Sequence, residues 1–140
     1  MEQPAIVISG AEPFMKPAIL KFTSGLCEIT DAEIDLILRP GAELALGKVF
    51  KPLPKGDQAV RDMDRVLHDI IRTDVQRALA MRHRACHCVI IGKVGVPKDS
   101  DYLDECKQFV MQEREAVAEW GMFKTIDIAI LTSDYEFVRE

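Results

Sequence analysis

The stretch Cys86-His87-Cys88-Val89-Ile90-Ile91-Gly92-Lys93-Val94 contains an apolar run that is interrupted only near its end by Gly92 and Lys93. Such a run predicts a strand that is covered on both faces, as in the middle of a parallel sheet. Residues 100–120 then place apolar side chains at helical spacing, and residues 123–131 form a second two-sided apolar run. Strand, helix and strand in this order predict a βαβ unit, whose two strands are parallel.

A long helix is predicted immediately before this unit, from Gly56 to about Arg82. Apolar residues recur there at i, i+3, i+4 and i+7, and charged residues fill the remaining positions. A helix of this length spans roughly 39 Å at 1.5 Å per residue. Because that is long for a domain of this size, we expect one end to project or to pack on a partner.

The first part of the chain has shorter patterns. Residues 5–8 predict a strand that ends at Ser9-Gly10. Residues 18–22 and 26–29 flank Thr23-Ser24-Gly25, a pattern typical of a β-hairpin in which Gly25 takes a positive φ. Residues 33–38 have features of both helix and strand, and their near alternation before Pro40 favours a strand. Residues 42–50 fit a short helix and a strand equally well.

These elements predict an α/β fold, with an α+β arrangement as the alternative. The expected order is an N-terminal β-hairpin or meander, a long helix and a C-terminal βαβ unit. Together they form a single mixed sheet with helices packed on it. The chain has 140 residues and shows no internal repeat and no long linker, so residues 1–140 are predicted to form a single domain.

Composition narrows the expected location and partners. The net charge of -5 argues against a nucleic-acid backbone as the main ligand. No apolar run approaches the roughly 20 residues of a membrane span, and the N-terminus lacks the basic-then-apolar pattern of a signal peptide. We therefore expect a cytoplasmic protein with reduced cysteines, no membrane association and no nucleic-acid partner.

The first candidate site is the His/Cys cluster at residues 83–88. Thiolates and imidazoles bind zinc and other soft metals, which makes His83, Cys86 and Cys88 candidate metal ligands. Alternation along a strand, however, places Cys86 and Cys88 on one face and His87 on the other. Since the sequence has no second ligand pair, core packing by the two cysteines is favoured. His83 and His87 are candidate acid–base residues.

The second candidate site is the loop at residues 92–101, which follows the first strand of the βαβ unit. Ligands of parallel α/β sheets bind beyond the carboxyl ends of the strands. The candidate ligand-binding residues are Gly92, Gly95, Lys98, Asp99 and Asp101, and Lys93 is expected to hold the charge of an anionic substrate. The carboxylates near the start of the following helix oppose a second anion there, which favours helix capping, or a divalent cation if they bind a ligand.

We expect a small cytoplasmic enzyme that acts on a small anionic or carbonyl-bearing metabolite. Its catalytic residues would be His83, His87 and Lys93, near the loop 92–101 and the cluster 83–88, at a site completed within a homo-oligomer. The sequence indicates no particular cofactor. The first alternative is a non-catalytic, oligomeric binding or assembly protein, as the long helix suggests. The second is a metal-responsive module that uses His83, Cys86 and Cys88.

Overall fold

A single five-stranded sheet organises the residues that the computed structural model describes, which are 4–10, 15–39, 58–82 and 87–139. The strands are β1 (Ala5–Ser9), β2 (Ile34–Leu38), β3 (His87–Lys93), β4 (Thr125–Leu131) and β5 (Phe137–Arg139). Their spatial order is β2-β1-β3-β4-β5. The first four are parallel to one another, and β5 is antiparallel to β4. The predicted α/β class with a single mixed sheet is therefore confirmed.

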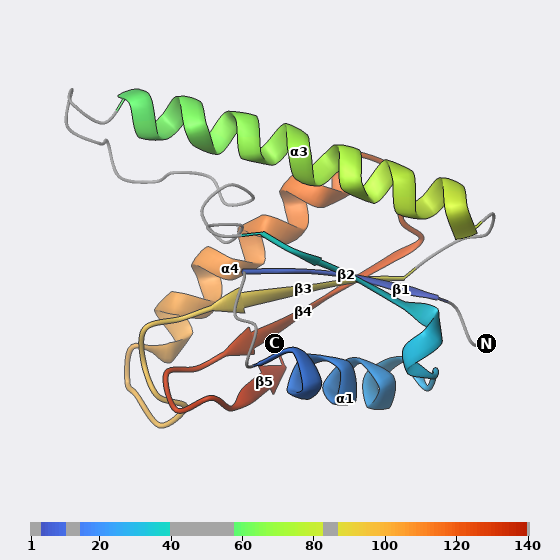
Figure 1. Ribbon diagram of the computed structural model, residues 1–140. Helices are drawn as coiled ribbons and strands as arrows, with labels where there is room; N and C mark the ends of the chain where they lie inside the picture. The colour runs from blue at the N-terminus through green and yellow to red at the C-terminus, as the bar shows by residue number, and fades with distance from the viewer. Residues whose placement is uncertain (1–3, 11–14, 40–57, 83–86, 140) are drawn as a thin grey trace.

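Three α-helices cover the two faces of this sheet. Helix α1 (Lys16–Cys27) lies on one face, and α3 (Gln58–Arg82) and α4 (Leu103–Ala118) lie on the other (Figure 1). The short 3-10 helix η2 (Asp31–Glu33) precedes β2. Among the described residues, no helix has the length and apolar character needed to cross a membrane. Both faces of β1, β3 and β4 are covered, which explains the apolar runs of these strands.

The predicted N-terminal β-hairpin is wrong, because residues 16–27 form helix α1. Pro17 lies in the first turn, where proline suits a helix. Ile19 and Thr23, four residues apart, are both buried, as expected of a helix face packed on the sheet. Gly25 does not take the positive φ that the hairpin required. The hairpin prediction is wrong because β1 and β2 are parallel neighbours. Parallel neighbours are joined by a crossover connection rather than by a tight turn.

The other predicted elements are found close to their expected bounds. Strand β2 confirms the interpretation of residues 33–38 as a strand, and α3 confirms the long helix. Strand β3, helix α4 and strand β4 confirm the βαβ unit and its parallel strands. Residues 42–50 lie outside the described residues. Strand β5 was not predicted, because its three residues are too few to show a period.

Two ion pairs fasten α3 to the edge strand β2. The carboxylate of Asp35 lies 2.8 Å from Arg82 Nε, and that of Asp74 lies 2.8 Å from Arg39. At the other side of the helix, Trp120 Nε1 donates to His68 Nε2 over 3.3 Å. Asp35 is thus a paired carboxylate between two elements, and His68 is the packed, hydrogen-bonded residue expected of a histidine beside an apolar face.

Candidate functional site

The two candidate regions lie at opposite edges of the sheet. His87 is the first residue of β3 and Lys93 is the last. Six residues of extended strand separate them by roughly 20 Å at about 3.3 Å per residue. His87 and Lys93 therefore cannot contribute to one small-molecule pocket within a single chain. Figure 1 shows the length of β3 that separates its two ends.

In the loop region, Gly92 serves packing rather than ligand approach. A Cβ atom at this position would lie 2.2 Å from Val110 Cγ1 of α4, far inside any van der Waals contact. The absence of a side chain lets α4 pack directly on β3. Gly95 differs, since a Cβ atom there would meet nothing within 4 Å and the residue is exposed.

Lys98 is engaged in holding the loop against the turn between β4 and β5. Its Nζ lies 3.0 Å from Glu136 Oε2, and the hydrogen bond and charge of Glu136 raise the pKa of Lys98. The hydroxyl of Thr132 donates to Asp134 and lowers the pKa of that carboxyl. The Ser133 N–H donates to the Val96 carbonyl over 3.0 Å in the same contact. Lys98 is therefore less suited to an external anion than the sequence suggested.

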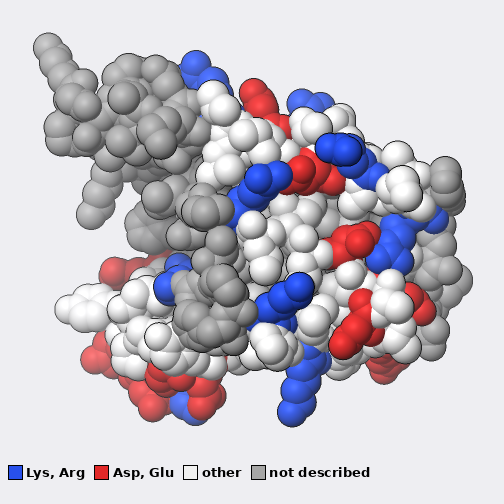
Figure 2. Space-filling model, in the orientation of Figure 1, with Lys and Arg blue, Asp and Glu red and all other residues white. Residues whose placement is uncertain are grey.

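The remaining loop residues give this region a negative character. Asp99 and Asp101 are exposed, and Asp104 and Glu105 occupy the first turn of α4. Figure 2 shows acidic side chains gathered at the lower left, where this loop leads into α4. The hydroxyl of Ser100 accepts the Tyr102 N–H over 3.1 Å, but Tyr102 is itself the N-cap residue of α4 and no side chain caps the helix, so the predicted capping by Asp99 or Ser100 is wrong. Because carboxylates already complement the dipole of α4, this helix start does not favour an anion.

Across the sheet, the start of α1 has the opposite character. Lys93 follows Ile91 by two residues, and Ile91 packs in the core beneath α1, so Lys93 lies on the α1 face. Helix α1 begins at this same edge, and its first turn contains Lys16 and no acidic residue. The chain leaves β1 for α1 and leaves β3 for α4 on the other face. This divergence defines the switch point at which doubly wound sheets bind ligands.

At the amino edge, His87 contacts two side chains of the neighbouring strand β4. Its Nε2 lies 2.7 Å from Asp127 Oδ2, and its Nδ1 is hydrogen-bonded to Thr125 Oγ1. His87 and Thr125 are register partners, and Asp127 is two residues further on the same face. The sequence pointed to His87 but missed Thr125. The predicted βαβ unit could have pointed to Thr125, because parallel neighbouring strands place their first residues side by side.

Of the three candidate metal ligands, the structure describes Cys88. Cys88 is completely buried in the core beneath α3 and α4, on the face opposite His87, as the core-packing interpretation requires. His83 and Cys86 lie outside the described residues. Among the residues that the structure describes, no group of three His, Cys, Asp or Glu side chains is arranged to hold a metal ion.

Cys27 ends α1 near the His87 contacts. Burial raises the pKa of its thiol, and the negative charge of Asp127 raises it further. A thiol with a raised pKa carries little thiolate at neutral pH and is a poor nucleophile. Cys27 is therefore a packing residue.

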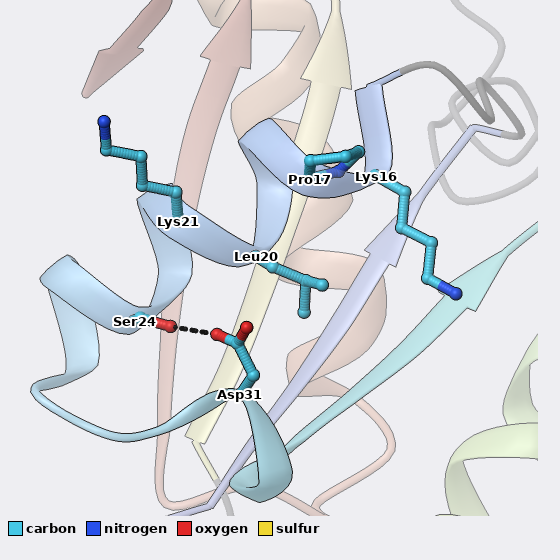
Figure 3. Close-up of a pocket in the computed structure, with 6 residues that line it drawn as sticks. All are labelled: Lys16, Pro17, Leu20, Lys21, Ser24 and Asp31. Atoms are coloured by element: carbon cyan, nitrogen blue, oxygen red, sulfur yellow. Dashed lines mark hydrogen bonds between the residues drawn. The ribbon is translucent and has the colours of Figure 1, made fainter.

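A hollow on the outer side of α1 is lined by Lys16, Pro17, Leu20, Lys21, Ser24 and Asp31. Figure 3 shows the ammonium groups of Lys16 and Lys21 pointing away from each other. The Ser24 hydroxyl donates to Asp31 over 2.8 Å, so these two polar groups of the hollow are hydrogen-bonded to each other. The two lysines do not converge on one ligand here.

The chain matches none of the protein-family models, curated proteins or solved structures with which it was compared. Its fold defines an α/β protein whose four parallel strands follow one of the two common doubly wound orders.

Proposed function

We propose that this protein is a small enzyme that binds a small anionic or carbonyl-bearing metabolite at the carboxyl edge of its sheet, between β1 and β3. The observation that carries this proposal is the order β2-β1-β3-β4 of the four parallel strands, in which the direction of winding reverses between β1 and β3. The chain winds outward to β2 from β1, and then in the opposite direction through β3 to β4. Loops at such a point diverge to opposite faces and leave a crevice for a ligand.

The charges at this edge favour the α1 side of the crevice. Lys93 is exposed on that side, and the first turn of α1, which contains no acidic residue, offers its positive dipole end. In this proposal the Lys93 ammonium binds the charge of the substrate or polarises its carbonyl. The exposed Gly95 leaves space beside the backbone. Asp99 and Asp101 belong to the acidic side and do not contact the anion.

Lys93→Ala tests this assignment against its neighbour in the same loop. A charge-assisted hydrogen bond contributes about 1.5–3 kcal/mol, so K93A is expected to weaken anion binding by roughly 10-fold to 100-fold. Lys98→Ala, which removes a lysine paired with Glu136, is the matched control and should change binding little. Inorganic phosphate, followed by NMR titration, is the first ligand to test. Equal losses in both variants, or a loss confined to K98A, would contradict the proposed position.

The proposed cellular setting is the cytoplasm. No disulfide joins the described cysteines Cys27, Cys88 and Cys106, which suits a reducing compartment.

An oligomeric assembly protein is the second candidate function. Val66 and Ile70 lie four residues apart on α3 and are 58% and 39% exposed. Apolar side chains at this spacing form one stripe on a helix, which suits contact with a second copy of the chain. Figure 1 shows that the amino-terminal turns of α3 reach beyond the ends of the strands. Light scattering on the full chain at micromolar concentration decides the point, since a monomer would remove this candidate.

A further inference from the structure

At the amino ends of β3 and β4, a carboxylate, an imidazole and a hydroxyl contact one another in that order. His87 lies between Asp127, which contacts Nε2 at 2.7 Å, and Thr125, whose hydroxyl is hydrogen-bonded to Nδ1. An ionised carboxylate only accepts hydrogen bonds, so Nε2 carries the proton and donates it to Asp127. In the neutral ring Nδ1 is then the acceptor, and the Thr125 hydroxyl donates to it.

Rigid elements hold this arrangement in place. All three residues lie on adjacent parallel strands, and the His87 N–H donates to the Pro4 carbonyl over 2.8 Å, which joins the start of β3 to the chain before β1. The imidazole is mostly covered, with 17% of its side chain exposed, whereas 36% of the Asp127 side chain is exposed. Thr125 is exposed, so a substrate carbonyl can reach its oxygen from solvent.

We propose that Thr125, His87 and Asp127 form a hydrolytic triad that cleaves small carboxylic esters. The ring nitrogens have exchanged roles relative to the usual serine-hydrolase arrangement, but the chemical order of hydroxyl, imidazole and carboxylate is the same. This site lies at the sheet edge opposite the proposed metabolite site and does not depend on it.

The reaction runs in two balanced steps. Thr125 Oγ1 attacks the ester carbonyl carbon while its proton moves to His87 Nδ1, and Asp127 stabilises the imidazolium. The bond from carbon to the leaving oxygen then breaks, and Nδ1 protonates that oxygen to release the alcohol. Water next attacks the acyl-threonine carbonyl and gives a proton to Nδ1. Finally, Oγ1 leaves, takes the proton back, and the free acid departs.

The neighbouring thiol does not compete for this role. Burial and the charge of Asp127 raise the pKa of Cys27, which keeps the sulfur protonated. The same carboxylate therefore disfavours the thiol as a nucleophile while it orients the imidazole toward a hydroxyl.

The test uses the wild-type chain and p-nitrophenyl acetate. We expect a burst of p-nitrophenolate and one acetyl group added to the protein, which peptide mapping places on Thr125. Thr125→Val and His87→Gln should lower the burst rate by at least about 100-fold. Thr125→Ser should retain the burst, because it keeps the hydroxyl. Thr73→Val is the matched control and should leave the burst unchanged. The Thr73 hydroxyl donates to the Asp69 carbonyl at an exposed position of α3.

The outcome that overturns the triad is equally definite. Hydrolysis that is equal in wild type and T125V, or acetylation confined to lysines or Cys27, would show that His87 and Thr125 are only a polar cross-strand pair. The mass measurement on the wild-type chain decides this even if a variant fails to fold. An acetyl group on Thr125 establishes the nucleophile, and its absence together with the absence of a burst removes it.

Discussion

Replacing Gly92 by alanine is expected to destabilise the protein by about 3 kcal/mol, at the upper end of the range for overpacked cores. The added Cβ would lie 2.2 Å from Val110 Cγ1 and 3.1 Å from Val110 Cβ. Relief requires α4 to move away from β3, because a rotation of the Val110 side chain leaves its Cβ in place. For a chain of this size the melting temperature should fall by roughly 10 °C, as calorimetry can measure.

Two further variants separate this steric effect from a general intolerance of the loop. Gly95→Ala adds the same atom where nothing lies within 4 Å, and should leave stability unchanged or raise it by under about 1 kcal/mol. The double variant G92A/V110A should be less destabilised than the sum of its two single changes, since the clashing atoms are gone. Equal effects of G92A and G95A would show that Gly92 is not a packing residue.

Ile71→Ala is expected to have the second large effect, a loss of about 2–5 kcal/mol in the free energy of unfolding. Ile71 is completely buried and belongs to the core that α3 and α4 form with the sheet. Removing three carbons there leaves a cavity that the strands cannot close. Urea unfolding followed by circular dichroism measures the change.

The adjacent residue provides the control for Ile71. Ile70 has the same side chain in the same helix but is 39% exposed, and alanine is the better helix former. I70A should therefore change stability by less than about 1 kcal/mol. If I70A were as destabilising as I71A, either α3 would pack with a different face or Ile70 would be buried against a second copy.

The sequence predicted best where a segment's own pattern agrees with its place in the sheet. Strand β3 and helix α3 are such cases. Burial on both faces gives the strand a continuous apolar run, and burial of one face gives the helix apolar residues at helical spacing. The prediction for residues 18–29 was wrong because their local pattern disagrees with their place in the fold. Its residues Thr23-Ser24-Gly25 carry a turn signal, whereas the parallel pairing of β1 with β2, which no local pattern records, required a helix.

For the candidate sites too, the sequence identified residues by type but did not show their long-range contacts. Residue type identified His87 and Lys93 as parts of one site, although the predicted strand already separates them, and the structure places them at opposite ends of β3. Glycine at position 92 suggested ligand approach, while the contact that explains it comes from Val110, on the helix that follows. Long-range packing decided each of these outcomes.

The proposed function requires a small anion to bind at the carboxyl ends of β1 and β3, on the α1 side of the sheet. The direct measurement is an NMR titration of the isotope-labelled wild-type chain with inorganic phosphate, followed through its assigned amide signals. We expect saturable shifts at Ser9, Gly10 and residues 93–95, together with the first turn of α1. Saturable shifts confined to residues 99–105 at the start of α4, or none at all, would contradict it.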